Sequence, residues 1–185
     1  TGASQRTILR ANSSFTTFTT PPVSPSATTG FFNSGNAAAW NGTMWVAVGS
    51  DVVSPATSAQ NIKYSYDGIN WTNATSGGFS STASSQGFAI AWNGLLWVAG
   101  GVDTNTLRYS YDGMNWITPA TANLMTTNCR GLAWNGTVFV AVGRGTNTIL
   151  YSYDGITWNA TAGTAQFSFY CKCLAWNGMW VAGGA

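Results

Sequence analysis

Two short motifs recur along the chain at a nearly constant interval, and this repetition restricts the fold more than any other feature. The tripeptide Trp-Asn-Gly begins at Trp40, Trp92, Trp134 and Trp176, with spacings of 52, 42 and 42 residues. The run YSYDG, followed by two residues and Trp, begins at Tyr64, Tyr109 and Tyr151 and alternates with the first motif. Periods of about 40 to 50 residues are typical of propellers and solenoids.

Each repeat contains signals for four short strands. Asn-Gly between two apolar runs is the strongest short-range indicator of a hairpin with a type I′ turn. Runs such as ILYSYD then alternate apolar or aromatic residues with Ser before an Asp-Gly turn and a short run ending in Trp. Without helical periodicity, this pattern predicts an all-β fold, a β-propeller of four-stranded antiparallel blades. The hairpin turns are Asn41-Gly42, Asn93-Gly94, Asn135-Gly136 and Asn177-Gly178.

The first strand of each repeat is expected to have one face of small side chains. Positions one, three and five residues before each Trp of the Trp-Asn-Gly motif hold only Ala, Gly or Cys. The intervening positions hold Ala38, Ile90, Leu132 and Leu174, so the other face is mostly bulky. Alternate residues of a strand share a face, so these strands could crowd around a narrow axis.

The start of the chain resembles the outer strands of a repeat, because residues 7–9 match residues 148–150. We expect residues 6 to 18 to complete the blade that begins at Cys171 and so to remove two exposed sheet edges. The result is a single domain, residues 1–185, of four blades. They cover about 35–74, 87–119, 129–160, and 171–185 plus 6–18. A larger propeller, completed by further sequence or another chain, is the alternative.

The Ser-x-Asp-Gly-x-x-Trp run resembles the Asp-box hairpin of sialidases, sialidase-like lectins and many non-enzymatic propellers, whose common form has one more residue between Asp and Gly. In that family the box is structural. The Asp can accept hydrogen bonds from amides two and three residues later, Gly takes a positive φ, and Trp covers the turn. The matching residues are Ser65, Asp67, Gly68, Trp71, Ser110, Asp112, Gly113, Trp116, Ser152, Asp154, Gly155 and Trp158. The two motifs are also similar to those of repeat proteins of large algal viruses, which implies a virion or host-contact role.

Composition argues against an enzyme. The five acidic residues are all Asp, and the chain has no Glu and no His. A sialidase-like site would need an Arg cluster, a Tyr nucleophile with a Glu partner and an Asp acid. The absence of His also excludes the ordinary Ser-His and Cys-His pairs and a His-ligated zinc site. We predict no catalytic residue, no metal and no cofactor.

Charge and hydropathy limit the classes of partner that we expect for this chain. Charged residues make up 6% of the chain and the net charge is +2, so no basic face is available for nucleic acid. No apolar stretch reaches the length of a membrane span. The leading hypothesis is a non-catalytic structural or recognition propeller, extracellular or on a virion surface, whose partners are other protein subunits or surface glycans. The alternatives are a carbohydrate-binding lectin propeller and a segment of a larger sialidase-like propeller.

Cysteines and sequons leave further alternatives open. Cys129 and Cys171 occupy equivalent repeat positions, and Cys173 is expected on the same strand face as Cys171. A Cys129–Cys171 disulfide requires Cα atoms within about 7 Å, and buried free thiols are the favoured interpretation. The Asn-x-Ser/Thr sequons would be N-glycosylation acceptors in a secreted eukaryotic protein, although Asn, Ser and Thr are simply abundant here. They are Asn12, Asn41, Asn70, Asn73, Asn135 and Asn159.

Overall fold

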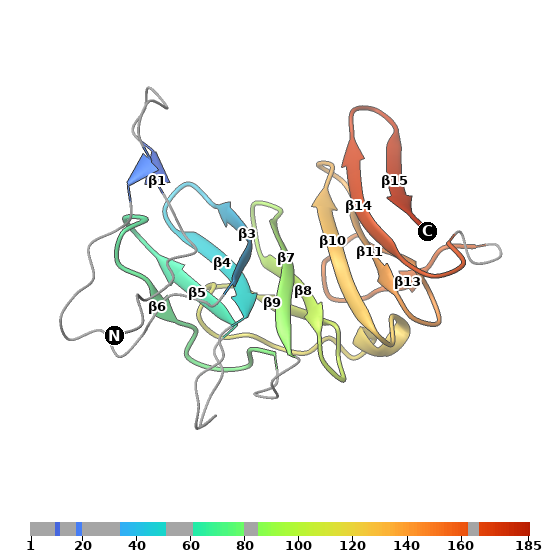
Figure 1. Ribbon diagram of the computed structural model, residues 1–185, viewed down its shortest axis with the longest axis horizontal. Helices are drawn as coiled ribbons and strands as arrows, with labels where there is room; N and C mark the ends of the chain where they lie inside the picture. The colour runs from blue at the N-terminus through green and yellow to red at the C-terminus, as the bar shows by residue number, and fades with distance from the viewer. Residues whose placement is uncertain (1–9, 12–17, 20–33, 51–60, 80–84, 163–166) are drawn as a thin grey trace.

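The computed structural model of the chain describes residues 10–11, 18–19, 34–50, 61–79, 85–162 and 167–185. These residues form an all-β structure of antiparallel strands, with one short 3₁₀ turn, η1 (Ala122–Leu124). Figure 1 shows its four main sheets standing side by side in chain order.

We number these sheets 1 to 4. Sheet 1 contains β3 (Ser34–Trp40), β4 (Trp45–Ser50), β5 (Ile62–Ser65) and β6 (Thr72–Asn73). Sheet 2 contains β7 (Gln86–Trp92), β8 (Trp97–Val102) and β9 (Leu107–Ser110). Sheet 3 contains β10 (Asn128–Trp134), β11 (Phe139–Arg144), β12 (Ile149–Ser152) and β13 (Asn159–Ala160). Sheet 4 contains β14 (Cys171–Trp176) and β15 (Trp180–Gly184).

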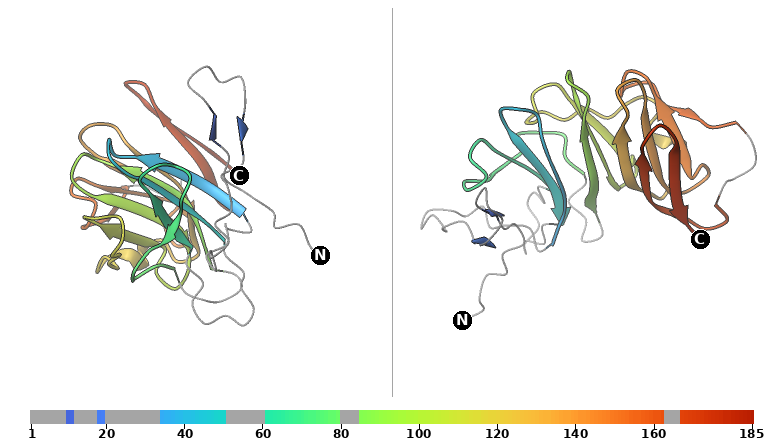
Figure 2. Two further views of the ribbon diagram at one scale, coloured as in Figure 1. Left: turned by 90° about the vertical axis from the view of Figure 1, so that its left-hand side faces the viewer. Right: turned by 90° about the horizontal axis from the view of Figure 1, so that it is seen from above.

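The first strands of the sheets lie next to one another. Strand β7 packs between β3 and β10, and β10 packs between β7 and β14. The row spreads as an open fan, with sheet 1 and sheet 4 at opposite ends (Figures 1 and 2). Within the described residues no comparable contact joins β14 to β3, so these four sheets do not close into a ring.

The completion of sheet 4 by residues 6 to 18 stays a prediction, because the structure describes only a few residues of that segment. Strand β1 (Arg10–Ala11) pairs with β2 (Phe18–Thr19), whereas the described strands of sheet 4 are β14 and β15 alone. The other residues between 6 and 18 lie outside the described part.

The hairpins form at the expected places, but their turns differ from the predicted type I′ geometry. Trp40 pairs with Trp45, so four residues connect β3 to β4. The Asn41 side chain accepts hydrogen bonds from the amides of Thr43 (2.9 Å) and Met44 (2.7 Å). The Asn therefore opens the turn as an Asx cap, and Gly42 follows with φ of +99°.

The first strand of every sheet contains a bulge. The expectation that all the small side chains of this strand share one face is therefore wrong. In β14 the pairing skips Lys172, so Cys171 and Cys173 face the consecutive residues Gly184 and Gly183. One extra residue reverses the side on which the following side chain lies. Cys171 and Cys173 therefore lie on opposite faces, and Cys171 is buried while Cys173 is exposed.

The core lies between consecutive sheets. We call the face of a sheet that packs on the next sheet its leading face, and the opposite one its trailing face. Val46 and Val48 on the leading face of sheet 1 share a cluster with Trp97 and Ile90 on the trailing face of sheet 2. The leading face of sheet 2 and the trailing face of sheet 3 form the second cluster.

The ten tryptophans are not uniformly core residues, although they repeat in register. Trp97, Trp116 and Trp158 are buried, but Trp40, Trp45 and Trp176 are exposed. Trp40 and Trp45 belong to sheet 1 and Trp176 to sheet 4, the two ends of the row, where the described residues place a neighbouring sheet on one side only.

Candidate functional site

The three Ser-x-Asp-Gly turns are the most chemically distinctive part of the chain. In sheet 2, Asp112 Oδ1 accepts hydrogen bonds from the amides of Met114 (2.8 Å) and Asn115 (2.7 Å), and Oδ2 accepts one from Asn115 Nδ2 (2.8 Å). Ser110 Oγ donates to Asp112 (2.9 Å) and accepts from the Gly113 amide (2.8 Å). The Trp116 indole donates to the Gly113 carbonyl (3.1 Å).

The other two turns repeat this arrangement. Asp67 and Asp154 each accept hydrogen bonds from the amides two and three residues later, at 2.7 to 2.8 Å. Burial raises the pKa of all three carboxyls, but these hydrogen bonds outweigh it. The net effect holds the pKa of Asp67 and Asp154 below the ordinary range and lowers that of Asp112 to about 2. The carboxylates remain ionised at neutral pH and stabilise their own turns.

Each turn also presents an exposed tyrosine. Tyr66, Tyr111 and Tyr153 are 59%, 56% and 66% exposed and stand directly before the Asp. Each lies edge-on to the Tyr two residues earlier, with ring centroids 5.9 to 6.0 Å apart. Sheets 1, 2 and 3 thus repeat one amphipathic aromatic side chain beside one carboxylate, a combination suited to recognition at a surface.

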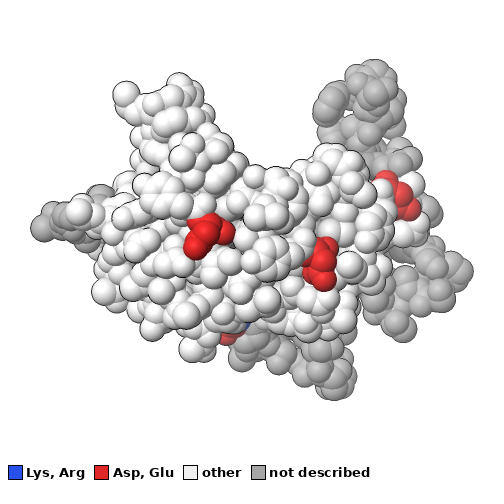
Figure 3. All heavy atoms as spheres, turned by 180° about the vertical axis from the view of Figure 1, so that it is seen from behind, with Lys and Arg blue, Asp and Glu red and all other residues white. Residues whose placement is uncertain are grey.

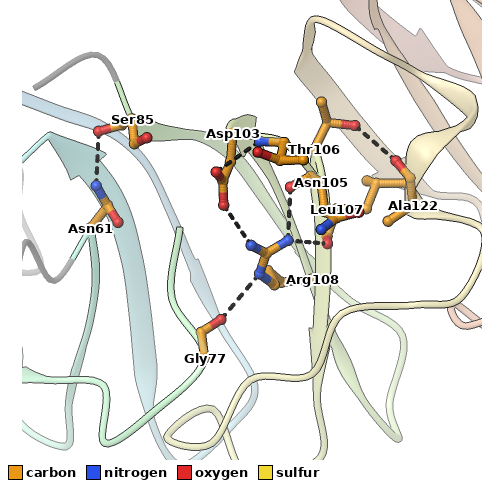
Figure 4. A network of polar contacts seen from close by, with 10 residues as sticks. Asn61, Gly77, Ser85, Asp103, Asn105, Thr106, Leu107, Arg108 and Ala122 are labelled. Atoms are coloured by element: carbon orange, nitrogen blue, oxygen red, sulfur yellow. Dashed lines mark hydrogen bonds and ion pairs between the residues drawn. The ribbon is translucent and has the colours of Figure 1, made fainter. Parts of the chain in front are cut away.

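A buried ion pair of sheet 2 also contacts the segment that follows sheet 1 (Figure 4). Arg108 of β9 binds Asp103 at 2.7 Å, and its side chain is 7% exposed. Its guanidinium also donates to the carbonyls of Gly77 (3.1 Å), Asn105 (2.7 Å) and Leu107 (2.9 Å). Burial lowers the pKa of Arg108, and the Asp103 charge opposes that shift. Because Gly77 follows the last strand of sheet 1, this cation ties the two sheets together.

Charge is sparse on the remaining surface. Figure 3 shows acidic side chains as separate groups on a face with very little exposed Lys or Arg. No group of three or more ligand-type side chains that could hold a metal ion occurs in the described ranges. Across the same residues, no helix has the length and apolar character needed to cross a bilayer.

The cysteines are free thiols, and the Cys129–Cys171 bridge considered from the sequence is not formed. Cys129 fills the space beside Gly100, where an added Cβ would lie 2.4 Å from its sulfur. Burial raises the pKa of the Cys129 thiol to about 12, which makes it a packing residue rather than a nucleophile.

Four of the sequon asparagines support turns or strands. Asn41 and Asn135 cap hairpin turns, Asn70 Nδ2 donates to Asp67, and Asn73 accepts a hydrogen bond from Lys63. Asn159 is exposed at the start of β13, and Asn12 lies outside the described residues. Glycosylation of these sites stays a prediction.

Sequence reasoning missed the ion pair and the exposed tyrosines. Arg108 stands where the neighbouring repeats have Lys63 and Leu150. Alignment of the repeats, which places this cation at the position of an apolar residue, was the available signal that it is buried. Each exposed tyrosine directly follows the buried serine that ends its strand, but this alternation alone does not tell which face is covered.

No protein-family model and no curated protein matches this sequence. Solved structures match its fold, among them the crystal structure of the computationally designed Ika8 protein. That match has a TM-score of 0.56 at 14% identity, over 84% of this chain and 44% of the designed chain. So low an identity shows a similar fold and nothing about activity. This chain spans less than half the length of the designed protein.

Proposed function

We propose that this chain is a non-catalytic β-propeller module with a structural or recognition role, working outside the cell or on a virion surface. Its partners are other protein subunits or surface glycans. Consecutive antiparallel sheets packed through their first strands support a blade arrangement. The Asp-box resemblance and the large loops between the repeated motifs also support it.

The non-catalytic proposal rests on the structural interactions that the described Asp carboxylates make. Asp67, Asp112 and Asp154 accept hydrogen bonds within their own turns. Asp103 pairs with the buried Arg108. A general acid must hold a proton near the working pH, and the lowered pKa of the three turn carboxyls removes that capacity. Asp51 lies outside the described residues.

A turnover screen tests this proposal. The chain is assayed with aryl glycosides, including sialosides, beside Asp51→Asn and Asp112→Asn variants. The expected result is no hydrolysis above buffer for any of the three proteins. A turnover lost in one variant that keeps the native circular dichroism spectrum would overturn the non-catalytic role.

The tyrosine row favours carbohydrate binding as a second candidate function. Aromatic faces stack on sugar rings, and Tyr66, Tyr111 and Tyr153 offer one such group on each of three sheets. A glycan array would compare the wild type with a triple Tyr→Ala variant, and Leu95→Ala is the matched control because Leu95 is 68% exposed in a hairpin turn. Binding that survives in Leu95→Ala and disappears in the triple variant would support the lectin. Without saturable binding by the wild type, the lectin is excluded and the structural role remains.

A further inference from the structure

The two ends of the row of sheets expose faces that are covered at every internal position. The leading face of sheet 4 and the trailing face of sheet 1 lie at opposite ends of the fan (Figures 1 and 2). Three rows of repeated side chains cross internal boundaries between the described sheets, and the corresponding side chains at the two ends lie on the open faces.

The first row joins a valine to an aromatic ring. Val46 and Val98 on leading faces are fully buried, and they share clusters with the buried Trp97 and Phe139 of the following sheets. At the ends of the row the equivalent Val181 is 60% exposed and Trp45 is 38% exposed. Among the described residues, neither of these side chains belongs to the clusters that bury its equivalents in the other sheets.

The second row places a side chain from one hairpin against the glycine of the next Asp turn. A Cβ at Gly113 would lie 2.5 Å from the Met44 methyl group, and one at Gly155 would lie 2.7 Å from Leu96. At Gly68 the nearest described atoms belong to Trp45 of the same sheet, at 3.7 Å. The equivalent of Met44 in sheet 4 is Met179, which is 69% exposed. One end therefore has the protruding methionine, and the other has the open glycine turn.

The third row pairs a small leading residue with a bulky trailing one. Ala37 and Ile90 share one cluster, and Leu174 of sheet 4 packs on Gly131 of sheet 3. At the ends the sizes are reversed. The leading residue is Cys173, larger than its Ala and Gly equivalents, and the trailing residue is Ala38, smaller than Ile90 or Leu174. Both end residues are small, so a contact between these two ends has more room at this position than the Ala–Ile and Gly–Leu pairs inside the row.

From the first two rows we infer that copies of this chain associate head to tail. The leading face of sheet 4 in one copy packs on the trailing face of sheet 1 in a second copy. Val181 then meets Trp45, Met179 meets Gly68, and Cys173 meets Ala38. These side chains are uncharged, so the contact buries no unpaired charge. The two faces differ, so the contact is heterologous and can continue from copy to copy until a ring closes.

This inference rests on the proposed structural module, for which it names the partner as a second copy of the chain. Contact between like faces would instead place Met179 against Met179 and leave both open glycine turns unfilled. Such a symmetric dimer also leaves the other end face exposed to solvent.

Sedimentation velocity on the intact chain tests the association. The wild type is expected to exceed its monomer mass of 19.5 kDa as concentration rises. Val181→Asp and Trp45→Asp each block one end, and each is expected to weaken self-association by about 100-fold or more. An equimolar mixture of the two variants should form a dimer, because each copy supplies the intact face that the other lacks. Met179→Asp and Ala38→Asp repeat the test at independent positions.

Leu95→Asp is the matched control, because it adds the same charge at an equally exposed apolar side chain away from both faces. It should associate like the wild type, and circular dichroism should show that every variant is folded. A wild type that stays monomeric at all concentrations would overturn the inference. A chain that covers its own end faces would give this monomeric result. Association that one variant abolishes and the other leaves intact would also overturn the inference, since only contact between like faces predicts that pattern. Either failure leaves the turnover result, and therefore the non-catalytic proposal, untouched.

Discussion

Removing Asp103 is expected to destabilise the protein more than any other single change of a charged residue in the described chain. The Asp103 and Arg108 side chains are 10% and 7% exposed, and their charged atoms lie 2.7 Å apart. Asp103→Ala leaves a buried guanidinium with three carbonyl partners but no opposite charge. Loss of one member of a buried pair costs about 3–5 kcal/mol. For a chain of this length that corresponds to a fall in Tm of about 6–20 °C.

The third repeat supplies the matched replacement for this pair. Gly145 and Leu150 occupy the positions of Asp103 and Arg108, and Leu150 is fully buried. The double variant Asp103→Ala/Arg108→Leu therefore places in sheet 2 an apolar side chain that the fold already accepts in sheet 3. Well-packed apolar replacements of buried ion pairs are often neutral or stabilising. The double variant should recover at least about 2 kcal/mol relative to Asp103→Ala, even though Arg108 also gives up its place over the Phe79 ring.

Urea denaturation at pH 7, followed by circular dichroism, measures the free energy of unfolding of the wild type, both single variants and the double variant. The coupling energy follows from the four values. A loss below about 1 kcal/mol for Asp103→Ala would show that water reaches the guanidinium and that the burial argument is wrong. A double variant no more stable than the weaker single variant would refute the equivalence of the two repeats.

The remaining predictions concern pH, a glycine and the thiols. The lowered pKa of Asp112 stabilises the fold above about pH 4 and is lost toward about pH 2, so the Tm difference between wild type and Asp112→Asn should shrink across that range. Gly113→Ala should cost about 1–3 kcal/mol more than Gly42→Ala in urea denaturation. Both glycines have positive φ, but only Gly113 has a neighbouring side chain within 4 Å of the added Cβ. Under native conditions iodoacetamide should modify the exposed Cys173 and spare the buried Cys129, as peptide mass spectrometry would show.

Each of these has a result that contradicts it. A Tm difference that is constant between pH 4 and pH 2 would mean that the turn hydrogen bonds do not favour the ionised Asp112. Equal costs for the two glycine variants would mean that the clash at Gly113 relaxes freely. Native labelling of Cys129 at the rate of Cys173 would show that sheets 2 and 3 separate readily, and a denatured sample provides the reference rate for both thiols.

The local structure of the candidate site could be read from sequence to a large degree. Serine, aspartate and glycine at fixed offsets predict the turn because its hydrogen bonds join residues no more than three apart, as those of Asp112 do. The bulge beside Cys171 could not be read, because it depends on how β14 pairs with β15. The buried Arg108 was also missed, since its partners come from separate segments of the chain.

The sequence by itself determined the all-β class, the order of the strands and the placement of the turns, because alternation and short-range hydrogen bonds are local properties. Only the tertiary structure decided which faces are covered. Trp45 and Trp97 hold the same position in the same motif, yet one is 38% exposed and the other fully buried. Burial depends on the neighbouring sheet and not on the residue's own repeat. The same motif is therefore core in the middle of the row and exposed surface at its end.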